Sequence, residues 1–165
     1  MTGSVPGPLN RTFEPVPTSP DAAAEPADLG SRLVALVVDA ILVVVLALPV
    51  ALVAATGDDA ATGGLAIPLV WFVYRALGDA TGGSLGKRLL RLRVVGARVG
   101  RPGLGAGATR NLWGLSAVLP TVLHPAVGNA LAVALSVAIA ISIARDPGER
   151  GWHDRIAGTA VRRPA

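Results

Sequence analysis

The chain has 165 residues, enough for one modest domain, and 52% of them are apolar while only 16% are charged. A soluble domain of this size needs a more polar surface, so these values and the mean hydropathy of +0.55 favour a membrane protein. The lack of cysteine excludes disulfides and thiolate metal sites.

The first 30 residues contain six prolines, many small residues and few large apolar ones. Such a segment buries too little apolar surface to offset the entropy lost on ordering, so we predict a disordered cytoplasmic arm over residues 1–30. The arm has neither the basic start nor the early apolar core of a secretory signal, and we expect it to be retained.

Four apolar stretches follow, at about residues 33–55, 60–77, 112–123 and 126–144. A helix needs ~20 residues to cross ~30 Å of hydrocarbon, and the first and fourth stretches have that length. The third is short, and whether it crosses fully or re-enters on one side stays open. We therefore predict an all-α fold, an integral membrane bundle of four transmembrane helices, for the domain at residues 31–163.

The fourth stretch carries small residues at every fourth position, namely Ala130, Ala134, Ala138 and Ser142. In a helix these residues form one row, which lets helices approach closely in lipid. We therefore expect a packed helix here, although the alternation of small and large residues is also typical of a strand.

The basic residues are concentrated between and after the apolar stretches, in the segment 78–111 and in the tail from Arg145 onward. The turns expected on the other side carry only Asp58 and Asp59. With both termini in the cytoplasm, all 15 basic residues lie on or at the edge of the cytoplasmic side, as the positive-inside rule requires. We predict a multi-pass protein of the plasma or inner membrane.

The central loop reads GGSLGKRLLRLRVVGARVGRPGLG. Leu85, Leu89 and Leu92 can share one face of a short helix, which would present basic residues to anionic lipid headgroups. We assign to this membrane-surface basic loop the residues Lys87, Arg88, Arg91 and Arg93. The alternative is that these charges only set the topology, which explains most of them. No aromatic residues interleave the arginines, so we expect no nucleic-acid partner.

Arg32 and Asp39 are seven residues apart, about two helical turns, and therefore lie on nearly the same face of the first apolar stretch. An unpaired carboxylate at this depth costs about 2.5–3.5 kcal/mol. Asp39 must pair with a cation or hold a proton, and Arg75 and Arg110 are candidate partners. A functional ionisable site and polar contacts that fix helix packing are equally good explanations.

His153 and Asp154 form the one pair that suggests metal or hydrolytic chemistry. The other histidine, His124, falls on the opposite side of the membrane in this topology, and one His–Asp pair is a poor ligand set. The sequence contains no grouping of nucleophile, base and orienting residue. We therefore expect no enzyme activity, no metal and no cofactor.

Four segments in order, RLVALVVDAIL, GGSLGKRLLRLRVV, RNL and GWHDRIAGTAV, together resemble the RDD family of bacterial membrane proteins. The resemblance covers roughly residues 30–163. The arginine and two aspartates of the family's name match Arg32, Asp39 and Asp154, and Ser84 stands where the family often has threonine. The resemblance implies a multi-pass protein for which ligand transport, or cation–proton exchange in some members, is proposed.

We therefore expect four functional charges, Arg32, Asp39, Asp154 and Arg110, to meet at the cytoplasmic mouth of the bundle. In this hypothesis Arg32 pairs with Asp154, and Asp39 lies deeper, near Arg110 or protonated. Three interpretations remain. The first is transport or cation–proton exchange through Asp39, for which a closed homo-oligomer would provide a central path. The second is an accessory or scaffold subunit of a larger membrane complex, and the third is binding of anionic headgroups by the basic loop.

Overall fold

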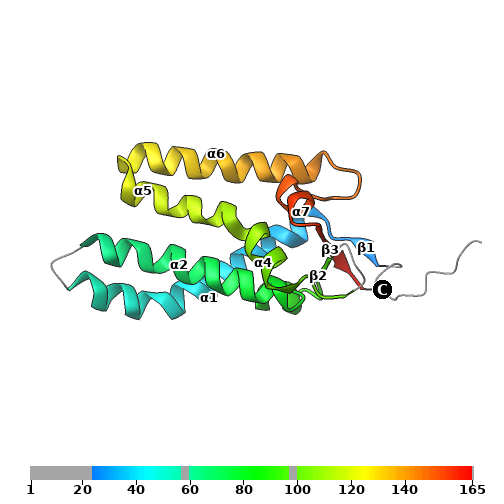
Figure 1. Ribbon diagram of the computed structural model, residues 1–165, viewed down its shortest axis with the longest axis horizontal. Helices are drawn as coiled ribbons and strands as arrows, with labels where there is room; N and C mark the ends of the chain where they lie inside the picture. The colour runs from blue at the N-terminus through cyan, green and yellow to red at the C-terminus, as the bar shows by residue number, and fades with distance from the viewer. Residues whose placement is uncertain (1–23, 57–59, 97–99, 165) are drawn as a thin grey trace, which may run out of the picture.

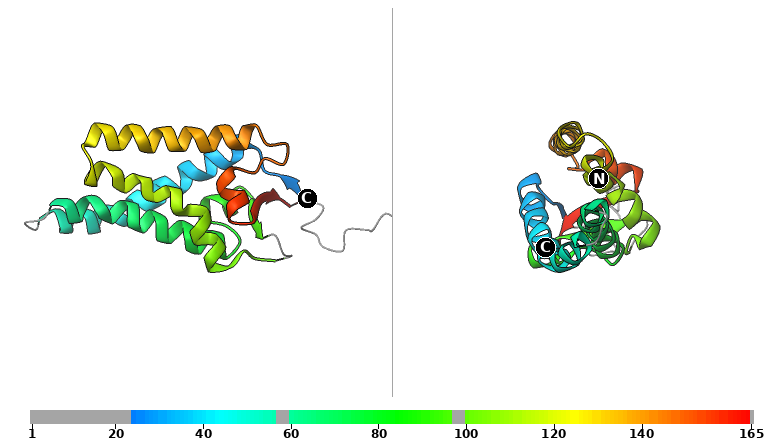
Figure 2. Two further views of the ribbon diagram at one scale, coloured as in Figure 1. Left: turned by 45° about the horizontal axis from the view of Figure 1, so that its top comes forward. Right: turned by 90° about the vertical axis from the view of Figure 1, so that its left-hand side faces the viewer.

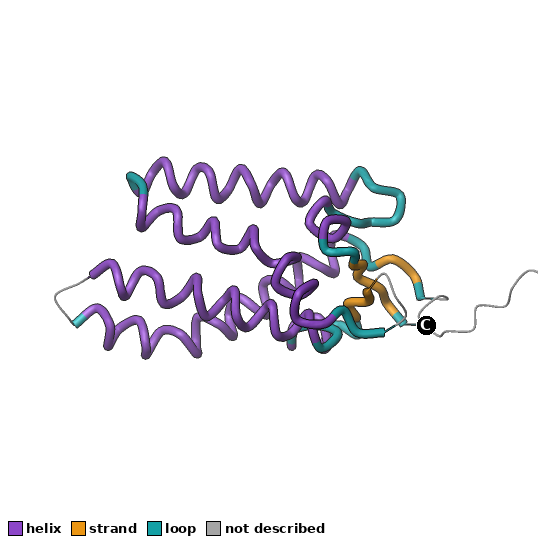
Figure 3. The backbone as a smooth tube through the Cα atoms, viewed as in Figure 1, coloured by secondary structure: helices purple, strands orange, loops and turns teal. Residues whose placement is uncertain are grey.

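A long helical bundle carries a small β-sheet at one of its ends (Figure 1 and Figure 3). The structure, a computed structural model, describes residues 24–56, 60–96 and 100–164. Its helices are α1 (Leu29–Ala55), α2 (Ala60–Ala80), α3 (Leu85–Leu89), α4 (Gly103–Asn111), the 3-10 helix η1 (Leu112–Val118), α5 (Leu119–Val122), α6 (Pro125–Ala144) and α7 (Trp152–Ile156). Its strands are β1 (Glu25–Pro26), β2 (Arg93–Gly96) and β3 (Thr159–Arg163).

Local sequence signals explain where α1 and α6, the two most apolar of the long helices, begin. The carboxylate of Asp28 caps α1, accepting hydrogen bonds from Ser31 N at 2.8 Å and from Ser31 Oγ at 2.6 Å. These two bonds lower the pKa of Asp28. Helix α6 begins with Pro125, whose fixed φ and missing N–H suit a first helical turn.

The helices run back and forth along the bundle axis. Helix α1 packs against α2, and α2 packs in turn against α4 and η1. The chain then turns after α5 into α6, which runs back to the sheet (Figure 1). The C-terminal end of α1, the start of α2 and the α5–α6 connection lie at one end, the hairpin end, whereas α7 and the strands lie at the other, the sheet end (Figure 1 and Figure 2). Asp58 and Asp59 lie outside the described residues.

The sheet is antiparallel, in the order β1-β3-β2, and it corrects the expectation of an all-α fold. Glu25 pairs with Arg163 in β3, and Val94 of β2 pairs with Val161. Strand β3 lies far along the chain from both of its partners, so no hairpin signal marks the pairing in the sequence. The strands are also too short to show an alternating pattern.

The predicted arm is too long at its C-terminal end. Residues 1–23 lie outside the described part of the chain, but from Ala24 on the chain is ordered against the domain, and Ala24 is itself buried. Ala27, only 1% exposed, packs in a small apolar core with Ala35, Leu92 and Val161. Packing against this core and pairing with β3 offset the conformational entropy that these residues lose on ordering. The composition of the segment gave no sign of these contacts.

Of the helices described, two are long and apolar enough to cross a membrane, over Leu29–Val53 and Pro125–Ala144. Only 22% and 17% of their most apolar stretches are buried inside the protein. Large side chains such as Val45, Val53 and Val133 therefore face outward. So large an apolar surface is unfavourable in water, and it indicates a membrane location. The second and third predicted spans coincide with α2 and with η1 and α5.

Candidate functional site

Buried charges gather where the helices meet the sheet. Three carboxylates there are fully buried, and four cations around them are at most 9% exposed. We call this set the charge network; its members are Asp39, Asp79, Asp154, Arg32, Arg75, Lys87 and Arg110. Charges taken out of water are tolerated only when they are paired and hydrogen-bonded, and each of the three carboxylates has such partners.

Asp39, from α1, accepts four hydrogen bonds. Its Oδ1 accepts from Tyr74 Oη at 2.7 Å and from the Gly86 backbone N at 2.8 Å. Its Oδ2 accepts from Arg75 Nη1 at 2.8 Å and from Ser84 Oγ at 2.5 Å. A carboxylate has about four lone-pair positions, so the acceptor capacity of Asp39 is filled. The four donors come from α2 and from the start of α3.

Gly86 makes the close approach of α3 to α1 possible. A Cβ at this position would lie 2.8 Å from Asp39 Oδ1 and even closer to the Ala35 carbonyl oxygen. Any side chain would therefore push α3 away from α1 and break the bond from the Gly86 N–H to Asp39. The Ser84 hydroxyl donates to the same carboxylate, which gives a physical role to two residues of the GGSLGK segment.

Asp79, near the end of α2, joins three helices. Its Oδ1 pairs with Lys87 Nζ of α3. Its Oδ2 lies 2.9 Å from Arg110 Nε and accepts a 3.0 Å hydrogen bond from Asn111 Nδ2, both of α4. Asn111 Oδ1 also accepts from Arg75 Nε at 3.4 Å, which connects this group to the Asp39 group. Burial, reinforced by the nearby Arg75, lowers the pKa of Lys87 to about 7.

Asp154, in α7, ties the C-terminal segment to the bundle. Its Oδ2 accepts hydrogen bonds from Arg32 Nη1 at 2.9 Å and from Gly151 N at 3.2 Å, and its Oδ1 lies 2.5 Å from Arg110 Nη1. Arg32 Nε donates to the carbonyl of Ala27 at 2.9 Å, next to β1. Although burial opposes the charge, Arg110, His153 and Arg32 lower the pKa of Asp154.

The hypothesis for the four functional charges is correct for the pair of Arg32 and Asp154. It is wrong for Asp39 and Arg110, which it placed next to each other. The expected pair of Arg32 and Asp154 is present. Asp39, however, pairs with Arg75, the other candidate, whereas Arg110 bridges Asp79 and Asp154. The reason is geometric: Arg75 lies on α2, which packs along α1, whereas Arg110 lies on α4, which packs on α2.

Lys87 was predicted to lie on the membrane surface, and that prediction is wrong because the residue is 3% exposed and pairs with Asp79. Helix α3 ends at Leu89, and Arg91 adopts a left-handed conformation with φ of 55°. This turn directs Leu92 into the core, while Leu89 stays 72% exposed. Leu89 and Leu92 therefore do not share one helical face, contrary to the prediction. The other members of the basic loop, Arg88, Arg91 and Arg93, are exposed.

Asp79 is the network member that the sequence prediction missed. It is the only acidic residue in the otherwise strongly basic segment 78–111, and it follows Arg75 by four positions. A single acid among many bases, one helical turn after an arginine, was the available signal. Among the described residues, no group of three His, Asp or Glu side chains is placed to hold a metal ion.

His153 lies beside Asp154 and is 7% exposed, with the rings of Trp113 and Trp152 edge-on at 6.4 Å. Burial lowers the pKa of His153 to about 4 from its ordinary 6.5. Between these values the unfolded chain binds more protons than the folded protein, so stability falls as the pH decreases through this window.

We therefore expect the free energy of unfolding in detergent to fall by about 2 kcal/mol between pH 7 and pH 5 through His153 alone. The variant His153→Phe keeps an aromatic ring but has no titrating group, so its loss over this range should be smaller by that amount. Thermal unfolding at both pH values measures the difference, and equal losses in the two proteins would refute the assignment.

Two long apolar helices with exposed flanks, joined at one end by buried arginine–aspartate pairs, indicate a membrane location. A family model described as "RDD family" matches residues 26–158, a range that contains the whole charge network. The chain belongs to the RDD family. Searches of curated proteins and of solved structures found no match.

Proposed function

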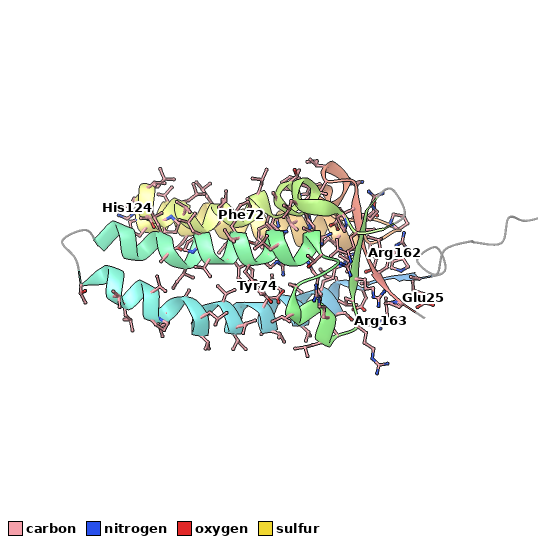
Figure 4. The ribbon with its side chains drawn as sticks, turned by 60° about the horizontal axis from the view of Figure 1, so that its bottom comes forward. Glu25, Phe72, Tyr74, His124, Arg162 and Arg163 are labelled. Carbon is pink, nitrogen blue, oxygen red and sulfur yellow. The ribbon has the colours of Figure 1, made fainter. Side chains whose placement is uncertain are left out.

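We propose that the chain crosses the plasma membrane four times and keeps both termini in the cytoplasm. Helix α2 runs alongside α1, and η1 and α5 run alongside α6, while α4 packs on α2 (Figure 1). His124 lies at the hairpin end, whereas Arg162 and Arg163 lie at the sheet end, which is rich in basic residues (Figure 4). The positive-inside rule then assigns the sheet end to the cytoplasm.

The geometry best supports a structural role, that of an accessory or scaffold subunit of a membrane assembly. The observation that carries this proposal is the filled acceptor capacity of Asp39. A proton added to this carboxylate would face a donor instead of an acceptor, and an incoming cation would have to displace at least one donor. Asp39 is therefore suited to hold α1, α2 and α3 together and poorly suited to load and release an ion.

The outer surface of α6 supports a partner for such a subunit. Ala130, Ala134 and Ala138 of the small-residue row are exposed, so the row faces away from the other helices of the chain. Ser142, the fourth member, is partly buried, and its Oγ accepts a hydrogen bond from Trp152 N at 3.2 Å. The three exposed alanines offer a surface on which another membrane helix, from a second copy or a different subunit, can pack closely.

The variant Asp39→Asn tests the proposal. Because Arg75 then loses its buried counter-charge, the free energy of unfolding should drop by about 3–5 kcal/mol. In proteoliposomes with equal amounts of folded protein, pH-driven proton and cation flux should be the same for wild type, Asp39→Asn and protein-free vesicles. A wild-type flux that disappears in Asp39→Asn would contradict the structural role.

Proton-coupled exchange is a second candidate, and Lys87 is the observation that favours it. A buried amine with a pKa of about 7 changes charge in the physiological range, and it lies outside the apolar spans, against Asp79. If this candidate is right, wild-type protein in the same assay should transport protons or cations, and Lys87→Met should not. If the role is structural, neither protein should give a flux above that of protein-free vesicles.

A further inference from the structure

A cavity of about 150 Å³ lies between the charge network and the sheet-end halves of α1 and α6. The four cations of the network contribute to its lining. The rest is mostly apolar and includes Leu36 of α1, Ile139 and Ala140 of α6, and Trp113 of η1. The lining thus combines cationic and apolar side chains, a combination that matches a molecule with a charged head and an apolar chain.

The charge of the lining has one sign. Among the described residues that line the cavity, none is acidic, although each of the four cations is paired with one of the three buried carboxylates. The network contains three arginines and Lys87 against three carboxylates, and only its basic members line the cavity; because the pKa of Lys87 is about 7, the net charge of the network at neutral pH lies between zero and +1. An excess of buried positive charge attracts an anion strongly, because the surrounding apolar groups screen it poorly.

Arg32 supplies a specific donor. Its side chain is 8% exposed and lines the cavity, and while Nη1 bonds Asp154 and Nε bonds Ala27, Nη2 has no hydrogen-bond partner within the described chain. A buried N–H of a guanidinium without an acceptor is costly, and a charged oxygen is its strongest acceptor. An oxyanion that binds beside Arg32 would give this N–H its acceptor after a small movement of the side chain, since Nη2 is closed to a molecule the size of water.

The mouth of the cavity indicates the route by which a ligand arrives. Two lining residues are exposed, Leu33 of α1 and Ser136 of α6, so the cavity opens sideways between the two helices that are candidate membrane spans. Its surroundings there are the exposed apolar faces of α1 and α6. A ligand that enters from this side arrives through lipid, and its apolar chain can remain between the helices.

We propose that this cavity binds an anionic amphiphile, with an oxyanion head, a phosphate monoester or a carboxylate, at Arg32 and an acyl chain between α1 and α6. The volume corresponds to about five water molecules at ~30 Å³ each, so it admits the head and the first carbons of the chain. This binding site is independent of the structural role of the network and of any partner subunit.

The full chain in an uncharged detergent, freed of co-purified lipid, provides the test. Thermal unfolding and native mass spectrometry would be followed with phosphatidic acid, oleate, phosphatidylcholine of the same acyl chains, and inorganic phosphate. We expect saturable stabilisation by several degrees and a bound adduct with the two anionic amphiphiles, and neither with the other probes. Equal effects of phosphatidylcholine, an equal effect of inorganic phosphate, or no effect of either anionic amphiphile would each overturn the proposal.

Matched variants on α6 locate the site. Ala140 lines the cavity, whereas Val137 on the same helix is exposed and does not line it, so Ala140→Phe should abolish the shift caused by phosphatidic acid and Val137→Phe should preserve it. Ser136→Phe narrows the mouth from an exposed position that tolerates a large side chain, and it should weaken binding by about tenfold or more. Unchanged binding in both Ser136→Phe and Ala140→Phe would refute this location. If Ala140→Phe does not fold, unchanged binding in Ser136→Phe would refute it.

Discussion

The variant Asp79→Asn should lose about 3–5 kcal/mol of the free energy of unfolding in detergent, which is enough to unfold many small proteins. Asp79 is fully buried and, within the described part of the chain, is the only carboxylate that pairs with Lys87. Asparagine has a similar shape, so the loss reports the missing charge: Lys87 must stay ionised without a partner or release its proton, and Arg110 keeps only Asp154.

Asp28→Asn is the matched control for this change. Asp28 pairs with Arg163 across 3.6 Å, but both side chains are about half exposed, and water screens such a pair. Asparagine also caps a helix about as well as aspartate. The control should therefore change stability by less than about 1 kcal/mol. A similar loss of unfolding free energy in both variants would mean that burial does not determine how much these charges contribute to stability.

Gly107→Ala should be nearly as damaging, through packing instead of charge. A Cβ on Gly107 would lie 2.9 Å from Ala80 N and even closer to the carbonyl oxygen of Ala76, so α4 must move away from α2. The displacement separates Arg110 and Asn111, in the last turn of α4, from Asp79. We expect a loss of at least about 2–3 kcal/mol, measured by thermal or denaturant unfolding.

Gly105, two residues earlier in α4, has no atom within 4 Å of the corresponding Cβ position. Alanine is a better helix former than glycine by about 1 kcal/mol, so Gly105→Ala should leave stability unchanged or raise it slightly. Opposite effects of the same substitution within one helix would isolate the contact between α4 and α2. Two equal effects would show that α4 does not lie this close to α2.

The sequence predicted the features that depend on composition and helical spacing. The long apolar stretches correspond to α1 and α6, whose ends carry local signals such as Pro125. The burial of Asp39 and its need for a cation followed from its place within an apolar helix. The pair of Arg32 and Asp154 was reached through the resemblance to the RDD family, since nothing local in the sequence connects residues 122 positions apart.

The remaining features depend on how closely distant elements approach. Lys87 is an ordinary basic residue in sequence, and it becomes buried only because Gly86 lets α3 contact α1. Arg110 was placed beside Asp39 because the sequence does not show that α4 packs on α2 and not on α1. The sheet was missed for a similar reason: β3 pairs with two short segments that are distant in the chain.

A double-mutant cycle on Asp79 and Lys87 tests most directly whether the charge network holds the sheet end together. The free energy of unfolding in detergent would be measured for wild type, Asp79→Asn, Lys87→Met and the double variant. If the charges act as buried pairs, Lys87→Met removes the stranded cation, and the double variant should be more stable than Asp79→Asn alone. A double variant that loses the sum of the two single losses would contradict this account.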